Sequence, residues 1–174
     1  MPKKIRQIRV EGNIAYVPLT QGYEAVIDAE DLHLAAGLNW YAAVTLRSDK
    51  TIRAVYAFGS ARFGAKQKTI LLHRIIAGTP EGLETDHIDG DGLNNRRSNL
   101  RNAMVCQNRR NRRVGVDNTS GVKGVSWHKK CGRWRADIML DGKKHYLGLF
   151  DAIDAAAKAY AAASAEFHDA FGRT

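Results

Sequence analysis

Residues 86–113 read DHIDGDGLNNRRSNLRNAMVCQNRRNRR. Three aspartates and one histidine lie within the first six positions, and seven arginines follow without any acidic residue. A solvated basic tail does not require Asp86 and His87, and a carboxylate metal site does not require seven arginines. The function of this stretch must therefore account for both groups.

Local patterns predict a strand, a loop, a second strand and a helix within this stretch. TDHI (85–88) is typical of a short strand, and DGDG (89–92) of a tight turn in which glycine supplies positive φ angles. RSNLRN (97–102) can return as the paired strand. Asn102 is then a plausible N-cap for a helix formed by the residues that follow. We expect this compact core to span about residues 83–113.

The residues before this core are predicted to be mainly β-structure. Short runs rich in Val, Ile, Tyr and Ala alternate with polar or glycine breaks in NIAYVPL (13–19), YEAVID (23–28), WYAAVTL (40–46) and TIRAVYAF (51–58). One short helix is expected at 28–37, with Asp28 capping its start. Residues 68–78 fit a strand or a helix equally. Trp40 and Tyr41 are expected in the core rather than on a binding surface.

The residues after the core predict a small sheet with one helix. VKGVSWHK (122–129), RWRADIML (133–140) and KKHYLGLF (143–150) have the pattern of three strands, and Asp141-Gly142 is a strong hairpin signal. The alanine-rich segment 151–172 should form a helix. Its apolar stripe consists of Ala156, Ala159, Tyr160, Ala163 and Phe167. The expected fold class is α+β, with domains at 1–116 and 117–174.

Composition indicates a polyanionic partner. The 174 residues carry a formal net charge of +9, and the pI is about 9.8. Nucleic acid is favoured over a membrane surface, because no apolar run approaches the roughly 20 residues that span a bilayer. Cys106 and Cys131 lack the C-x-x-C spacing of a metal or redox pair, which fits a reducing compartment. We expect a cytoplasmic, monomeric protein.

Simpler interpretations of the acidic cluster fail. A calcium-binding EF-hand loop that began at Asp89 would place Leu93 fifth and Leu100 twelfth, where oxygen ligands are needed. A zinc site lacks ligands at the required spacing. An Asp-Gly hairpin turn explains residues 89–92 but not Asp86 and His87.

Asp86-His87, Asn99 in SNLR and Asn108 in CQNRR resemble the HNH nuclease motif of the ββα-metal fold. The flanking LLHRIIAG and QNRRNRR resemble the phage and intron-encoded homing-endonuclease branch, in which asparagine replaces the last histidine. Residues 120–160, SGVKGVSWHKKCGRWRADIMLDGKKHYLGLFDAIDAAAKAY, resemble an AP2 DNA-binding domain. An HNH core followed by an AP2 domain is the order found in phage-type HNH endonucleases.

The resemblance implies a metal-dependent endonuclease that hydrolyses phosphodiester bonds of double-stranded DNA, as a nick or a double-strand break. Asp86 and Asn108 would bind Mg²⁺, with Mn²⁺ as a substitute, because magnesium takes few protein oxygens and completes its shell with water and phosphate. His87 would be the general base, since its reference pKa lies near 6.5. Asn99 would bond backbone across the loop and orient His87.

The basic and sheet residues are expected to contact DNA. The predicted phosphate contacts in the core are Arg96, Arg97, Arg101, Arg109, Arg110, Arg112 and Arg113. Strand parity predicts that a polar face of the sheet reads DNA, and this face would carry Lys123, Trp127, Arg135, Asp137, Met139, Lys144 and Tyr146. Two alternatives stay open: a catalytically inactive, sequence-specific DNA-binding regulator, and a structural RNA-binding protein.

Overall fold

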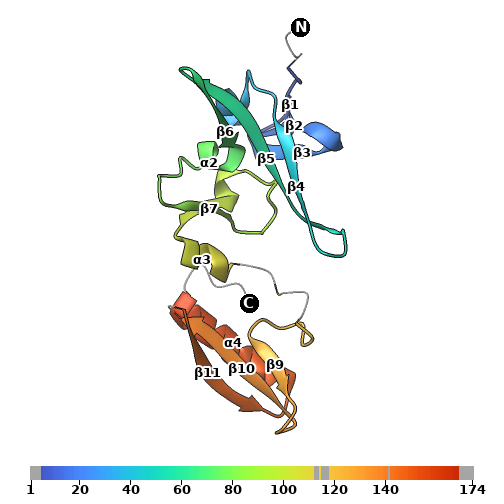
Figure 1. Ribbon diagram of the computed structural model, residues 1–174, viewed down its shortest axis with the longest axis vertical. Coiled ribbons are helices and arrows are strands. Elements are labelled where there is room, and N and C mark those ends of the chain that lie inside the picture. Colours follow the sequence, from blue (N-terminus) through green and yellow to red (C-terminus); the bar gives the residue numbers. More distant parts are fainter. Residues whose placement is uncertain (1–4, 112–113, 115–117, 141, 169–174) are drawn as a thin grey trace. The chain divides into compact units, whose positions relative to one another are not determined.

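The computed structural model describes residues 5–111, 114, 118–140 and 142–168. The chain divides into two compact units, the first ending at Met104 and the second beginning at Val105 (Figure 1). Each unit is α+β with small antiparallel sheets. The predicted domain boundary between residues 116 and 117 lies further along the chain and stays a prediction. No helix among the described residues is long and apolar enough to cross a membrane.

Two three-stranded antiparallel sheets form most of the first unit. The first has the order β1-β2-β3 and comprises β1 (Arg9–Glu11), β2 (Ile14–Pro18) and β3 (Glu24–Asp28). The second has the order β4-β5-β6 and comprises β4 (Tyr41–Leu46), β5 (Ile52–Phe63) and β6 (Lys66–Leu71). These strands confirm the β-rich prediction, because β2 to β5 fall on the runs rich in Val, Ile, Tyr and Ala.

The expected short helix after β3 is split and is not capped as predicted. A 3-10 turn at Ala29–Asp31 precedes α1 (Leu32–Ala35), and the side chain of Asp28 makes no capping bond. The Asp28 carboxylate accepts hydrogen bonds from Arg96 and from the backbone of Arg97 instead. A partner distant in sequence thus replaces the local cap.

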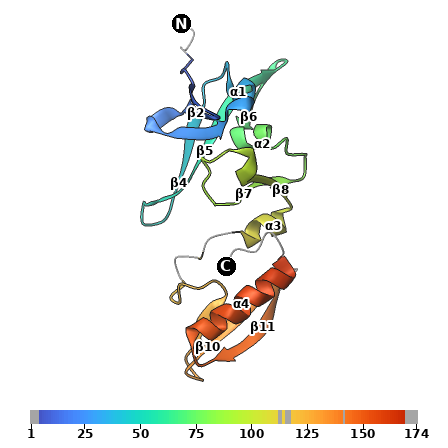
Figure 2. The same cartoon turned by 180° about the vertical axis from the view of Figure 1, so that it is seen from behind.

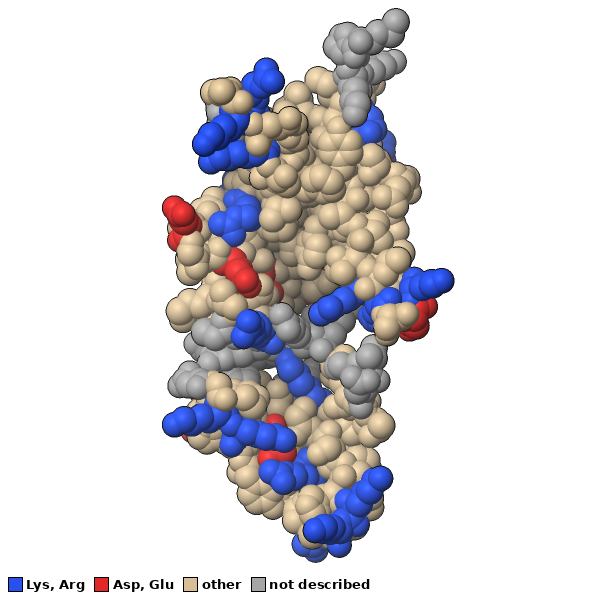
Figure 3. Space-filling view, in the orientation of Figure 1, with Lys and Arg blue, Asp and Glu red and all other residues tan. Residues whose placement is uncertain are grey.

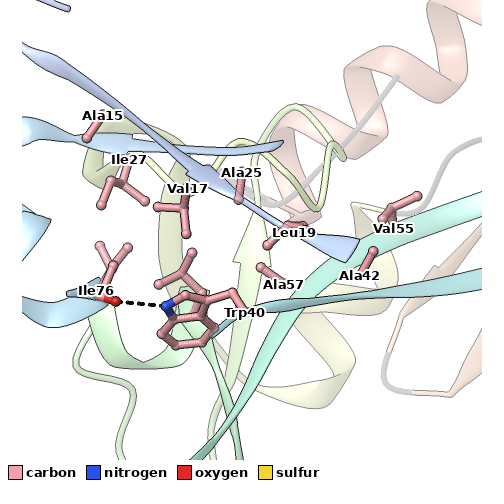
Figure 4. Close-up of a cluster of buried hydrophobic side chains, with 12 residues drawn as sticks. Ala15, Val17, Leu19, Ala25, Ile27, Trp40, Ala42, Val55, Ala57 and Ile76 are labelled. Carbon is pink, nitrogen blue, oxygen red and sulfur yellow. Dashed lines mark hydrogen bonds between the residues drawn. The ribbon is translucent and has the colours of Figure 1, made fainter. Parts of the chain in front are cut away.

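Trp40 lies at the centre of the first core, as expected. Its side chain is 1% exposed, and its indole N–H donates to the carbonyl of Ala35 at 2.9 Å (Figure 4). The apolar faces of both sheets meet around it through small and branched residues such as Val17, Ile27 and Ala57. The indole therefore buries its large apolar body while its one polar atom is satisfied.

The segment that fitted strand or helix equally contains both. Strand β6 ends at Leu71, and α2 (Leu72–Ile76) begins at the next residue. The chain then forms β7 (Glu84–His87), a long loop, a 3-10 turn at Arg97–Asn99, and β8 (Leu100–Ala103), which pairs antiparallel with β7 (Figure 2). Helix α3 (Val105–Arg110) follows in the second unit.

The strand–loop–strand–helix order matches the prediction, but the N-cap does not. Asn102 lies within β8 opposite Thr85, and its amide donates to the carbonyl of Ala77 at 3.4 Å. Strand pairing continues through Ala103, so the helix begins later than expected. Asn102 is consequently a strand residue rather than a helix cap.

The second unit contains a three-stranded antiparallel sheet packed on one helix. The sheet has the order β11-β10-β9 and is formed by β9 (Val125–His128), β10 (Arg133–Leu140) and β11 (Lys143–Phe150); α4 (Ile153–His168) covers one face (Figures 1 and 2). The small core consists of Val125, Ala136, Ile138, Ala156, Tyr160 and Ala163. This is the predicted arrangement, although Phe167 of the expected stripe is 44% exposed.

Candidate functional site: a buried histidine pair and a basic sheet face

The loop that joins β7 to β8 is anchored to the first sheet. The backbone N–H of Val26 donates to the carbonyl of Leu93, and the N–H of Asn95 donates to the carbonyl of Val26. Gly92 lies so close to β5 that an added Cβ would be 2.3 Å from the carbonyl oxygen of Val55. The loop is therefore a packed part of the unit, and it gives the side chains that it carries a defined frame.

Asp86 is held by an arginine on the neighbouring strand. Asp86 and Arg101 are direct partners in the β7–β8 pairing, and Arg101 Nε and Nη2 lie 2.8 and 2.7 Å from Asp86 Oδ2. The carboxylate is almost fully buried, so it requires a charged or hydrogen-bonding partner. Arg101, predicted to bind a phosphate, is in this structure the counter-ion of Asp86.

His87 lies in a buried aromatic cluster. The centroid of its ring is 5.1 Å from that of His73, in an edge-to-face arrangement, and 5.8 Å from that of Tyr56. The Tyr56 ring is also 5.8 Å from the His73 ring. The three rings come from β5, α2 and β7, so the fold brings a tyrosine and two histidines together from distant parts of the sequence.

A hydrogen bond from His87 to Asn95 identifies the tautomer of His87. The Asn95 amide nitrogen donates to the carbonyl of Leu93 at 2.9 Å, which identifies Oδ1 as the acceptor end of that side chain. Oδ1 lies 3.3 Å from His87 Nε2, so the neutral imidazole carries its proton on Nε2. The lone pair is then on Nδ1. Asn95 is fully buried and was missed in the sequence, because its partners depend on the path of the loop.

Both histidines are neutral near pH 7. Burial lowers the pKa of His73 to about 4, and the neighbouring His87 lowers it further in the same direction. Burial also lowers the pKa of His87, although the hydrogen bond to Asn95 and the charge of Asp89 oppose this effect. His73 Nδ1 is buried and has no hydrogen-bond partner among the described residues. His73 thus combines burial with an unsatisfied polar atom.

Asn99 ties the two ends of the loop together. Its Oδ1 accepts from the backbone N–H of Asp89 at 3.0 Å, and its amide nitrogen donates to the carbonyl of Asn94 at 2.8 Å and to Asp89 Oδ1 at 2.9 Å. These bonds confirm that the amide bonds backbone across the loop. The side chain that contacts the His87 ring is Asn95, so any influence of Asn99 on His87 passes through the loop.

The carboxylate of Asp89 is bonded within the loop. It accepts from the backbone N–H of Asp91 and from the amides of Asn94 and Asn99. Partial burial acts to raise the pKa of Asp89, but these hydrogen bonds together outweigh it, so the pKa lies below its usual value. The Asp-Gly turn is therefore fixed by side chains as well as by glycine.

Two further arginines of the predicted phosphate-binding set also have carboxylate partners. Arg96 Nε donates to Asp28 Oδ1 at 2.9 Å, and Arg97 Nη2 lies 2.6 Å from the buried Asp31. These pairs join the loop to the segment after β3, which the sequence did not predict. Arg97 is still about half exposed.

The remaining members of that set lie on or after α3. Arg109 is exposed, Arg110 belongs to the same helix, and Arg112 and Arg113 lie outside the described residues. Asn108 also lies on α3, in the other compact unit, so its pairing with Asp86 around a metal stays a prediction.

Arg101 limits how Asp86 could bind the predicted Mg²⁺. In the described part of the chain, no three His, Cys, Asp or Glu side chains gather closely enough to hold a metal. Asp86 Oδ2 already accepts both bonds from Arg101, and a cation placed there would compete with the guanidinium. A metal that bound through Oδ2 would displace Arg101, and Mg²⁺ at Asp86 stays a prediction.

In the second unit, the face of the sheet opposite α4 carries a network of charged side chains. Arg135 Nε lies 3.0 and 2.9 Å from the two carboxylate oxygens of Asp137, and Lys144 Nζ lies 3.2 Å from Asp137 Oδ2. The Arg135 guanidinium also lies over the Tyr146 ring, 5.3 Å from its centroid. Asp137 is 5% exposed. Asp137 therefore fixes the side chains of Arg135 and Lys144, and its own carboxylate is not exposed to solvent.

The pairing register confirms part of the predicted face. Met139 is opposite Lys144, and Asp137 is opposite Tyr146, so these residues share one side with Arg135. A bulge in β11 leaves Leu147 without a partner, so that Gly148 pairs with Ala136 and Leu149 with Arg135. Figure 3 shows Lys and Arg side chains gathered over this part of the molecule.

The predicted placement of Trp127 is wrong. Trp127 is opposite Trp134 in the β9–β10 pairing, and their ring centroids are 5.0 Å apart. It therefore lies on the side of Val125, which is buried towards α4, and not on the side of Arg135. Lys123 precedes β9 and has no place in the strand. The residues that the register puts on the polar face instead are Ser126, His128 and Arg133.

Comparisons with known proteins give two kinds of similarity. The chain is 38% identical to protein 3.8 of Escherichia phage T7 over 94 residues, which is 54% of this chain and 77% of that protein. It is 39% identical over 59 residues to an AP2-like ethylene-responsive transcription factor of Arabidopsis thaliana and to an APETALA2-like protein 2 of Oryza sativa. These matches cover 34% of this chain but only 12% and 14% of the plant proteins.

No protein-family model and no solved structure matches the chain. The phage relative exceeds 30% identity, and the matched region covers more than two thirds of its length. The plant matches add an AP2-like region to the same chain. On this basis, the chain belongs to the family of the phage T7 protein 3.8.

Proposed function

We propose that this protein binds double-stranded DNA through the polar face of the β9–β10–β11 sheet. The observation that carries the proposal is the network in which the buried Asp137 holds Arg135 and Lys144 on an exposed face. A guanidinium and an ammonium held at fixed positions can contact phosphates or base edges without first losing side-chain freedom. The similarity to an AP2-like transcription factor over 59 residues supports this proposal.

The proposal is tested by measuring DNA affinity in the full-length protein. A double substitution, Arg135→Ala with Lys144→Ala, should weaken binding to a duplex and lower the salt dependence of the affinity, because each lost phosphate contact lowers the slope of log K against log salt by about 0.9. Lys158→Ala is the control, since Lys158 is exposed on α4, the helix that covers the other face. Equal binding by the double variant and the wild type would refute the proposal.

A second candidate function is an HNH-type DNA endonuclease, favoured by the tautomer of His87. Because Asn95 fixes the proton on Nε2, Nδ1 carries the lone pair that a general base needs, and the low pKa keeps the ring neutral at pH 7. In this proposal, His87 Nδ1 takes a proton from the attacking water, and Asn99 and Asn95 keep the loop and the ring in place. Asp86 would hold the proposed Mg²⁺ while it shares its carboxylate with Arg101, and the ion would supply Lewis-acid assistance at the scissile phosphate.

Cleavage of supercoiled plasmid separates the two candidates. The wild type and His87→Ala should be compared in Mg²⁺, in Mn²⁺ and in EDTA, with DNA affinity measured in parallel. An endonuclease should cut with a divalent ion, and His87→Ala should lose cleavage while it keeps its affinity. If the wild type binds the plasmid but cuts it with neither ion, the protein is a DNA-binding regulator without nuclease activity.

A further inference from the structure

The sequence between residues 50 and 80 is basic and contains no acidic residue. Its six basic residues are Lys50, Arg53, Arg62, Lys66, Lys68 and Arg74. This segment forms β5, β6 and α2 in the first unit. Nothing in the predicted HNH or AP2-like regions uses the β5–β6 hairpin.

The outer half of this hairpin is a two-stranded ribbon. β5 pairs with β4 from Ile52 to Phe58 and with β6 from Phe58 to Phe63, so only Phe58 has a neighbour on each side. Beyond this point, the small residues Gly59, Ser60 and Ala61 leave little apolar surface to bury. Ile70 packs against the first core, whereas Lys66, Gln67, Lys68 and Thr69 of β6 are exposed, so the outer end of the ribbon is open to a partner.

Charged side chains project from both faces of this ribbon. Arg62 pairs with Gln67 on one face, while Lys66 and Lys68 lie on the other. All four side chains are exposed. A bond of 2.6 Å from Gln67 Nε2 to Ser60 Oγ links the two strands. Figure 3 shows basic side chains at this end of the first unit, with no acidic surface beside them.

The ribbon differs from the other basic groups in its unit. Arg96, Arg97 and Arg101 are all paired with buried or partly buried aspartates, which neutralise them. The ribbon itself contains no carboxylate, and its exposed Arg62 and Lys66 can bind an external anion. The major groove of B-DNA admits a two-stranded β-ribbon, and its walls are lined with phosphates.

We propose that the β5–β6 ribbon is a second DNA-contact surface, which enters the major groove and binds phosphates through Arg62 and Lys66. The inference rests on the proposed DNA-binding function and adds a site in the unit that contains His87. Strand β6 runs directly into α2, whose second residue is His73, so the ribbon and the histidine pair are linked by consecutive residues. DNA bound by the ribbon would therefore be held at a fixed position relative to the first unit.

The test uses full-length protein and a duplex of about four helical turns, roughly 40 base pairs at 10.5 base pairs per turn. Arg62→Ala with Lys66→Ala is compared with Arg9→Ala with Lys158→Ala, which lowers the net charge equally at exposed positions away from the ribbon. The ribbon variant should lower the slope of log K against log salt by about 1.8, because two phosphate contacts are lost. Between 50 and 200 mM salt, wild-type affinity should then fall about 12-fold more than that of the variant.

The location of the contact is read by hydroxyl-radical footprinting. The wild type should protect a segment that the ribbon variant leaves open, whereas the control variant should protect the same segment as the wild type. An unchanged slope and footprint, or equal changes in both variants, would overturn the inference. The sheet variant with Arg135→Ala and Lys144→Ala separates the two proposals: if it alone keeps wild-type binding, the sheet proposal fails and the ribbon proposal stands.

Discussion

His73 should make the first unit less stable as the pH falls from 6.5 towards 4. Its imidazole is 8% exposed, its Nδ1 has no partner in the described part of the chain, and burial lowers its pKa to about 4. The unfolded chain has the ordinary value near 6.5, so between these two values the unfolded state binds more protons than the folded state. The stability that depends on a neutral His73 is therefore complete above pH 6.5 and is lost as the pH falls to the folded value.

The size of the effect follows from this interval. A difference of about 2.5 in pKa, at about 1.4 kcal/mol for each unit, corresponds to about 3.5 kcal/mol of unfolding free energy, of which about 3 kcal/mol is lost by pH 4. His73→Phe keeps an aromatic ring beside Tyr56 and His87 but cannot be protonated. At pH 7.5 this variant should be as stable as the wild type or more stable, because it removes an unsatisfied buried nitrogen.

The measurement is urea unfolding of the wild type and of His73→Phe at several values between pH 4 and 7.5. The stability of the wild type should fall relative to the variant by about 3 kcal/mol over this range. His87 is present in both proteins, so its own titration largely cancels in the comparison. Parallel curves for the two proteins would refute the assignment of His73 as a buried neutral imidazole.

Other substitutions test the loop and the sheet. Asn99→Ala should lower the unfolding free energy by about 2 kcal/mol, because its buried amide makes three hydrogen bonds, and thermal unfolding measures this loss. Gly92→Ala should cost about 3 kcal/mol, because the added Cβ meets the backbone of Val55; unchanged stability would show that the loop does not pack there. Trp127→Ala should lower stability by about 1 kcal/mol through its lost ring contact while leaving DNA affinity unaltered in anisotropy titrations. Tyr146→Ala should weaken DNA binding by about 1 kcal/mol, or about fivefold, and equal affinities for these last two variants would contradict the assignment of the faces.

The strands were predictable from sequence because their patterns are local. Short runs rich in Val, Ile, Tyr and Ala identified β2 to β4 and the first part of β5, strand patterns and turns identified β9 to β11, and the alanine-rich segment identified α4. The side of the sheet that each residue of β9 occupies was harder to predict. The sequence-based assignment of Trp127 used only the alternation of side chains within one short strand. The structure shows that Val125 is buried against α4, and Trp127 lies on the same side as Val125. That side is determined by the pairing register with β10, which the sequence of β9 does not reveal.

The partners of the candidate site could not be predicted for a different reason. The pairs of Asp28 with Arg96 and of Asp31 with Arg97 join residues more than 60 positions apart. No local spacing indicates that a basic run will find acidic partners so far away. The contact between Asn95 and His87 likewise depends on a loop that first docks on β3.

The bulge in β11 fixes the alignment of the sheet through backbone positions, independently of the side chains on its outer face. Gly148 has a φ of 140°, which residues with a Cβ rarely adopt, and it pairs with Ala136 next to the residue without a partner. A slip of β11 along β10 would move that conformation onto a residue that resists it. The alignment is thereby locked by backbone and buried positions. Outward side chains on this face can therefore be exchanged, and the proposed DNA contacts altered, while the strands stay in the same alignment.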